Sequence, residues 1–179
     1  MKEYLPQLHG YLKAKAQYMG YENGLPWYEL FAPIAKDNKT YTAEEAKAYL
    51  MNIFENCNKK MAEITDRAFE EGWIDFFPRE GKVGGAFCAD LGSVKEFRVL
   101  TNFDGAFTDV VTLAHELGHA FHNYCLQDQR PLNQDYSMPL AETASTFNEC
   151  VVMATAIQDA KNNNEKLALI ESQLQDATQ

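Results

Sequence analysis

The sequence lacks the features that mark membrane-spanning and secreted proteins. No apolar run in the 179 residues approaches the roughly 20 residues that a helix needs to span a bilayer. The first residues, from Met1 to Tyr4, contain no apolar signal-peptide core. We therefore expect a protein with no membrane partner and a cytoplasmic location.

Basic residues are also scarce. The chain has 16 Lys and Arg residues against 26 Asp and Glu residues, which gives a formal net charge of −10. Nucleic-acid binding depends on clustered Lys and Arg side chains that neutralise phosphates, so this balance argues against a nucleic-acid partner. The negative charge is typical of a soluble acidic protein, and it weakly favours basic peptides as ligands.

The four cysteines form no close pair and no CxxC motif. They lie at positions 57, 88, 125 and 150. Widely spaced cysteines are expected to be reduced thiols, and we predict that most are buried, as in many cytoplasmic proteins. A zinc ligand role is not expected for Cys125, because water-activating zinc sites of the kind discussed below use His and carboxylate ligands.

Hydrophobic periodicity predicts a mainly α-helical fold with a small β-sheet element. A capping box at Thr42–Glu45 begins one of the helices, and Asn164 is the expected N-cap of the last. The aromatic stretch 25–33 is expected to be a packed connector, and residues 37–39 a turn. The predicted helices cover residues 4–19, 42–60, 61–70, 108–125, 138–161 and 165–176, and the predicted strands cover 83–89 and 97–103. We treat residues 1–179 as a single segment, with a helical part at 1–71 and a β element at about 83–103.

The most informative motif is His115-Glu116-Leu117-Gly118-His119. On a helix, His115 and His119 project from one face, one turn apart, where their neutral imidazoles can bind one zinc ion. Glu116 then lies beside the metal, in the position of a general base that takes a proton from a zinc-bound water. The alternative is that these three residues occur by chance on a buried helix.

The surroundings of the motif support the metal site. Gly118 costs about 1 kcal/mol relative to Ala in a helix, which suggests that another backbone approaches closely there. Thr108 is the expected N-cap of this helix, with Asp109 in its first turn. His122 adds a third histidine on the same face; it could bind substrate, hold a site carboxylate, or be a buried hydrogen-bonded core residue.

A catalytic zinc needs a third protein ligand from another element. Glu142 and Glu149 are seven residues apart, so both face one side of the helix predicted at 138–161. If that helix packs on the histidine helix, one glutamate can bind the metal while the other orients a ligand imidazole. Two solvated surface glutamates are the alternative.

The run Gly84-Gly85-Ala86-Phe87 is a second candidate site. Two glycines in a strand leave room for an approaching chain. We predict an extended edge strand near the zinc that pairs with the substrate backbone. A bend or bulge packed on the core is the alternative.

Four segments of the chain, in the same order, resemble oligoendopeptidase F, of the thimet oligopeptidase family of zinc metallopeptidases. They are residues 81–87, residues 102–103, the run 112–122 around the histidines, and the run 139–149. The resemblance implies that Glu142 is the third zinc ligand and Glu116 the general base. It also implies a zincin-like helical metallopeptidase core with a deep channel that admits short peptides.

Members of that family are several times longer than this chain. The resemblance implies a downstream segment, with Tyr and His, that stabilises the oxyanion, and the chain has no such segment after the motifs. We therefore expect the zinc-binding core fragment of an oligopeptidase, with one Zn²⁺ per chain, short peptides as substrates and possible self-association. Two rival interpretations are a metal-binding helical module without catalysis and a helical scaffold that binds no metal.

Overall fold

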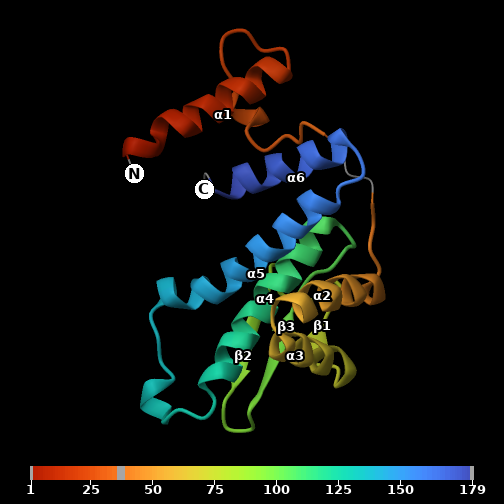
Figure 1. The fold of residues 1–179 in the computed structure, drawn as a ribbon, viewed down its shortest axis with the longest axis vertical. Coiled ribbons are helices and arrows are strands. Elements are labelled where there is room, and N and C mark those ends of the chain that lie inside the picture. The colour runs from red at the N-terminus through yellow and green to blue at the C-terminus, as the bar shows by residue number, and fades with distance from the viewer. Residues whose placement is uncertain (1, 36–38, 178–179) are drawn as a thin grey trace. The chain divides into compact units, whose positions relative to one another are not determined.

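The computed structural model describes residues 2–35 and 39–177 and divides the chain into two compact units. The first unit contains Met1–Asn38 and Ala156–Gln179, and the second contains Lys39–Thr155. Figure 1 labels the helices and strands of both. The fold is mainly α-helical with one small sheet, as the sequence predicts. Whether residues 1–179 act as one catalytic segment stays a prediction.

The first unit is built from α1 (Leu5–Tyr18), α6 (Asn163–Asp176) and the last residues of α5. A buried ion pair joins α1 to α6, with Lys15 Nζ 2.6 Å from Glu171 Oε1. The hydroxyl of Tyr11 also donates to Glu171, over 2.8 Å. Asn162, and not Asn164 as predicted, caps α6, because its side chain accepts from the backbone of Asn164 and Glu165.

The aromatic connector of the first unit is less packed than predicted. Trp27 is 86% exposed, and Tyr28 and Phe31 are exposed as well, although Trp27–Glu29 forms a short 3-10 helix. The prolines that bound this stretch prevent a longer helix that could bury one face. Of the turn predicted at 37–39, residues 37 and 38 lie outside the described part of the chain.

The second unit begins with two helices, α2 (Ala43–Cys57) and α3 (Lys59–Glu70). The predicted capping box is present, since the Thr42 hydroxyl accepts from the Glu45 N–H and the Glu45 carboxylate accepts from the Thr42 N–H. Asn58 separates the two helices, because its extended backbone ends α2 and its side chain caps α3.

The sheet has three strands, β1 (Ile74–Asp75), β2 (Phe87–Leu91) and β3 (Glu96–Leu100), in the order β1-β3-β2. β2 pairs with β3 antiparallel, and β1 pairs with β3 parallel. The strand predicted at 83–89 therefore begins later, at Phe87. Gly85 has a φ of +81°, which is incompatible with a strand, so residues 83–86 form a bend instead.

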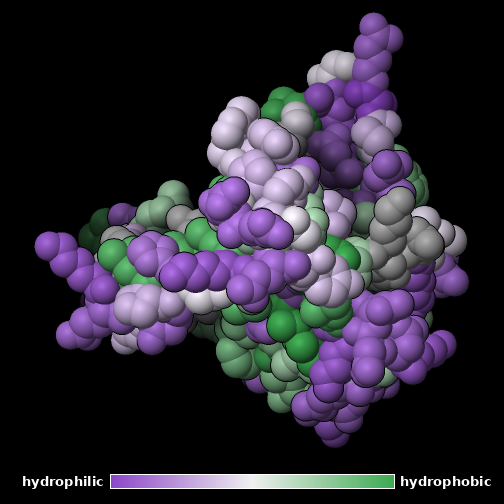
Figure 2. Space-filling view, turned by 90° about the horizontal axis from the view of Figure 1, so that it is seen from above, coloured by the Kyte–Doolittle hydropathy of each residue, from purple (hydrophilic) through white to green (hydrophobic). Residues whose placement is uncertain are grey.

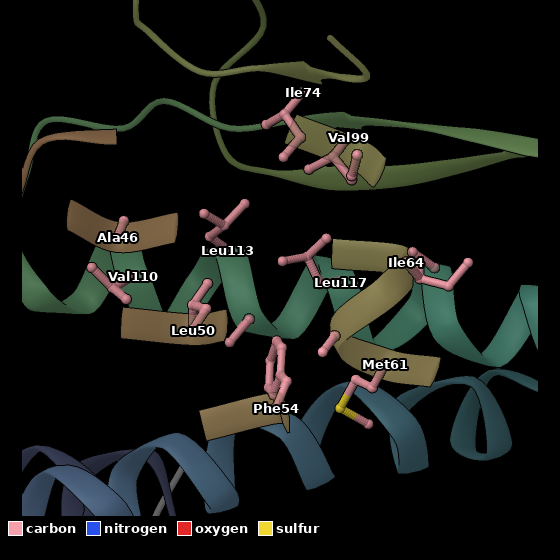
Figure 3. Close-up of a cluster of buried hydrophobic side chains, with 14 of the residues drawn as sticks. Ala46, Leu50, Phe54, Met61, Ile64, Ile74, Val99, Val110, Leu113 and Leu117 are labelled. Carbon is pink, nitrogen blue, oxygen red and sulfur yellow. The ribbon is translucent and has the colours of Figure 1, made fainter. Parts of the chain in front are cut away.

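Helix α4 (Phe107–Leu126) contacts strands β2 and β3 and also helices α2 and α3. Figure 3 shows Leu113 and Leu117 of α4 among side chains from α2, α3 and the sheet, including Leu50 and Val99. The N-cap predicted at Thr108 is wrong: the cap is Ala106, and the Asp109 carboxylate accepts from the backbone N–H groups of Asp104 and Ala106.

Helix α5 (Met138–Asp159) follows a loop that contains the short 3-10 helix Pro131–Asn133. Its length agrees with the prediction. Among the described residues, none of the helices combines the length and the apolar character that a membrane crossing requires.

The cysteines are less buried than predicted. Cys57, Cys125 and Cys150 are exposed, and Cys88 is partly buried. All four are free thiols. Each exposed cysteine lies on the solvent-facing side of a helix, α2, α4 or α5, while other residues of that helix are buried in the core.

Candidate metal centre

Helices α4 and α5 are in direct backbone contact at Gly118. A Cβ atom at this position would lie 2.6 Å from the Ala144 carbonyl oxygen and 2.7 Å from the Ser145 Cα atom. Such distances are too short for any side chain, so only glycine permits this approach. The close backbone contact predicted from the cost of Gly118 is present, and it brings the N-terminal part of α5 onto the histidine face of α4.

This packing brings His115, His119 and Glu142 together, as the sequence predicts. The Nε2 atoms of the two histidines are 3.2 Å apart. Glu142 Oε2 lies 3.3 Å from His115 Nε2 and 3.6 Å from His119 Nε2. Ligands placed tetrahedrally at about 2.0–2.1 Å from a zinc ion are roughly 3.3–3.4 Å from one another. The triangle of donor atoms thus has the size of one face of a zinc coordination shell.

Both imidazoles are oriented by a second contact. The Nδ1 atom of His115 donates to Glu149 Oε1, and a hydrogen bond to the backbone of Ala141 holds His119. The Glu149 carboxylate raises the pKa of His115, against the smaller effect of burial. Burial, and then the nearby His115, lower the pKa of His119. His119 is therefore kept in the neutral form that a metal ion requires.

These contacts favour ring protons on the Nδ1 atoms, so no proton lies between the three donor atoms of the centre. When the Nδ1 atoms carry the ring protons, both Nε2 atoms and Glu142 Oε2 present lone pairs to the same point. Lone pairs at these distances repel unless a proton or a cation lies between them. The donor set of two imidazoles and one carboxylate is that of a catalytic zinc site, and the residues therefore fit this metal.

Glu116 lies beside the triangle, on the buried side of α4. The residue is only 5% exposed, and its Oε2 atom has no hydrogen-bond partner among the residues that the structure describes. Burial raises the pKa of Glu116; the nearby His115 opposes this rise, and Glu142 and Glu149 add to it. A buried carboxylate with a free oxygen and a raised pKa has the properties of a proton acceptor.

His122 is not brought to a site carboxylate. Its ring stacks on Tyr136, with centroids 4.3 Å apart and an interplanar angle of 22°. Its Nδ1 atom is buried, and no hydrogen-bond partner for it occurs in the described part of the chain. It lines an apolar hollow between α4 and α5, together with Phe121, Leu140 and Phe147. This stacked arrangement differs from both the carboxylate contact and the hydrogen-bonded core residue considered from the sequence.

The run Gly84-Gly85-Ala86-Phe87 is only partly a strand. Phe87 begins β2, an edge strand of the sheet that packs against α4. The next residue, Cys88, has a thiol pKa that is raised mainly by burial and, to a smaller extent, by the negative charge of Glu116. The Asn102 side chain donates to the carbonyls of Val83 and Gly85 and fixes the bend before the strand. Cys88 of β2 thus lies near Glu116.

Two buried residues at the contact between α4 and α5 were not predicted from the sequence. Ser145 and Asn148 are fully buried, whereas the neighbouring Phe147 is exposed. Asn148 donates to the Ala114 carbonyl, and Ser145 donates to Glu142 Oε2 over 2.7 Å. Their spacing of three residues from Glu142 and from each other would have placed them on the same face of α5.

Comparison with known proteins gives the family of the chain. The family model of peptidase family M3 matches residues 36–179, which include every residue of the candidate metal centre. The chain belongs to peptidase family M3.

Among relatives in the family, group B oligopeptidase PepB of Streptococcus agalactiae is 29% identical over 171 residues, which are 95% of this chain and 28% of that protein. Oligopeptidase PepF of Bacillus subtilis is 27% identical over 98% of this chain and 26% of its own length. The chain therefore spans less than a third of the length of these M3 relatives.

Solved structures give the same fold. A crystallised protein of Chlamydophila abortus, described as a peptidase, superimposes with a TM-score of 0.81 at 25% identity, over 93% of this chain and 28% of that one. PZ peptidase A, solved with an inhibitor, superimposes with a TM-score of 0.75 at 22% identity, over 95% of this chain and 31% of its own. The latter similarity concerns the fold alone.

Proposed function

We propose that this chain is the metal-binding core of a zinc-dependent oligopeptidase that hydrolyses peptide bonds in short peptides. The observation that carries the proposal is the triangle of His115 Nε2, His119 Nε2 and Glu142 Oε2, whose edges of 3.2, 3.3 and 3.6 Å suit one zinc ion. Membership of family M3 and the similarity to the oligopeptidases PepB and PepF support the substrate class. A cytoplasmic location stays a prediction.

Three residues would hold the ion and a fourth would move the proton. His115, His119 and Glu142 are the ligands, and Glu149 keeps the His115 ring in position. When bound, zinc would polarise the peptide carbonyl and make the attacking water more acidic. Glu116 accepts the proton of that water at its free Oε2 atom and returns it to the leaving amine. Its raised pKa brings the acceptor closer to the operating pH, which favours both transfers.

The peptide would lie along the free edge of β2. Within residues 2–35 and 39–177, this edge has no strand beside it in the sheet order β1-β3-β2, and the strand packs on the helix that carries Glu116. Backbone N–H and carbonyl groups there are available to an extended peptide. Of the run 84–87, Phe87 belongs to that strand, and the bend at Gly84–Ala86 would leave room for the incoming chain.

The test separates the base from the ligands. Glu116→Gln keeps the shape and removes proton acceptance, so peptide hydrolysis should fall by at least about 100-fold while zinc stays bound. Turnover is measured with fluorogenic peptides on the longest natural polypeptide that contains this sequence. Glu63→Gln, on the exposed face of α3, is the control that should leave turnover unchanged. If the Glu116→Gln variant turned over peptides at nearly the wild-type rate, the role of Glu116 as the general base would be rejected.

The rival interpretation is a metal-binding module without catalysis. It predicts stoichiometric zinc and no hydrolysis in any natural form of the protein. The buried Oε2 atom of Glu116, which has no hydrogen-bond partner in the described ranges, disfavours this rival, because a purely structural site gains nothing from a buried carboxylate oxygen without a partner.

A further inference from the structure

We infer that Ser145 is a positioning residue for the metal ligand Glu142. Its hydroxyl donates to Glu142 Oε2 over 2.7 Å, and this oxygen is the one that faces both histidines. The inference rests on the proposed function and adds a residue on which the strength of metal binding depends.

The bond to the carboxylate is the stronger of the two that Ser145 can form. A hydroxyl has one proton, and the alternative acceptor is the Glu142 backbone carbonyl at 3.1 Å. The carboxylate oxygen is closer and carries negative charge, so the bond to it is charge-assisted. Ordinary back-bonding of a helical serine to its own helix would leave the carboxylate without this contact.

Glu142 needs such a contact because it is poorly held otherwise. Its side chain is 41% exposed, whereas that of His115 is 24% exposed and that of His119 17%. An exposed glutamate side chain rotates freely in solvent, and a ligand must lose that freedom when it binds a metal. Ser145 is 0% exposed and its position is fixed by the backbone, so it holds one carboxylate oxygen in place before the metal arrives.

The close packing of the two helices sets the position of Ser145. Its Cα atom lies where a side chain of residue 118 would otherwise be, 2.7 Å from a Cβ built on Gly118. The position of Ser145 therefore depends on Gly118, because the glycine allows the α5 backbone to approach α4. From that position the Ser145 hydroxyl contacts the metal ligand Glu142.

Thr146 offers a matched control on the same helix. Its hydroxyl donates to the Glu142 backbone carbonyl over 2.5 Å, and the residue is exposed. The two hydroxyls are neighbours in sequence and both bond to Glu142, but only that of Ser145 reaches the carboxylate. A merely structural role of such hydroxyls would show in the thermal stability of the metal-free protein, not in zinc affinity.

The experiment measures zinc affinity by competition with a chelator, on the 179-residue chain and its variants, together with thermal unfolding of the metal-free forms. Ser145→Ala should weaken zinc binding by about 10- to 100-fold, the usual effect of losing a contact that orients a ligand. Thr146→Ala should stay within about twofold of the wild type. If Ser145→Ala does not fold, Ser145→Gly takes its place, because it also removes the hydroxyl and adds no group that could bind zinc.

Two results would overturn the inference: wild-type affinity in the Ser145 variant, or an equal loss in Thr146→Ala. A different result would reject the proposed function: a wild-type chain that takes up no zinc has no metal site. The two failures can therefore be told apart in the same experiment.

Discussion

At the residue scale, the two ring nitrogens of His115 have different partners. Nε2 faces the metal position, and Nδ1 donates to Glu149. This contact is the main reason that the pKa of His115 lies above its ordinary value of 6.5. In the metal-free protein the raised pKa stabilises the fold below pH 6.5, and that contribution disappears as the pH rises through the raised value. Zinc needs the neutral ring, so protons compete with zinc below the same raised pKa.

Replacing Glu149 therefore has two opposite effects. In Glu149→Gln, the pKa of His115 should fall toward 6.5, so proton competition begins at lower pH. Zinc affinity at pH 8 should nevertheless drop by about 10- to 100-fold, because the ring is no longer oriented by a carboxylate. Histidine NMR titration of the metal-free form and chelator competition measure the two effects. Asp159→Asn, exposed near the end of the same helix, is the control. An unchanged His115 pKa in Glu149→Gln would contradict the assignment.

Most residues of the candidate centre could be predicted from their spacing. His115 and His119 are four apart on one helix, and Glu142 and Glu149 share a face of another, so helical geometry alone predicts the pairs. Ser145 could not be assigned in this way, because a helical serine usually bonds to its own backbone. The stacking of His122 on Tyr136 depends on the path of the loop between α4 and α5, which helical spacing does not describe.

At the scale of elements, the contact between α4 and α5 decides whether the ligands meet. Gly118→Ala should destabilise the fold by about 1–3 kcal/mol, because the added Cβ would overlap the α5 backbone. Zinc affinity should fall with it, since α5 carries Glu142. In an open helix the same change stabilises, and Gly10→Ala in α1, where a Cβ meets nothing within 4 Å, should gain up to about 1 kcal/mol.

Urea unfolding of the two alanine variants and the wild type measures both effects. A Gly118→Ala variant as stable as Gly10→Ala, with wild-type zinc affinity, would show that the close approach at Gly118 is not required for the site.

The helices were predictable because their caps and apolar faces are local features. The capping box at Thr42 is an example. The sheet was less predictable, because β1 is two residues long and is defined only by its pairing with β3. The start of β2 depends on the left-handed backbone of Gly85, and the strand pattern of residues 83–89 conceals that bend. The start of α4 was misplaced because the Asp109 carboxylate caps the helix from within its first turn, by accepting from the Ala106 N–H.

At the scale of the whole molecule, the chain spans 28% of PepB and 26% of PepF. We expect the 179-residue chain to bind zinc, because the proposed ligands and their supports all lie within residues 115–149. We expect it to hydrolyse short peptides slowly. The family resemblance implies oxyanion donors elsewhere in longer members, and removing a single donor costs about 10²–10³ in rate. Turnover equal to that of a full-length relative would contradict this.

The same chain is expected to self-associate. Hydrophobic side chains are visible on the face shown in Figure 2, and Leu132, Met138, Leu140 and Phe147 of the second unit are each at least half exposed. Apolar patches of this kind promote association. Sedimentation should detect dimers or larger species at micromolar concentrations, and Leu140→Gln combined with Phe147→Gln should reduce them. A monomer at all concentrations would reject the prediction.

The central claim is that His115, His119 and Glu142 hold one zinc ion, and metal analysis after zinc titration and desalting tests it most directly. We predict one equivalent of zinc in the wild-type chain and none in His119→Ala. His9→Ala, which removes an exposed histidine from α1, should retain one equivalent and serves as the control. A wild-type chain without bound zinc, or a His119→Ala variant that retains a full equivalent, would contradict the account.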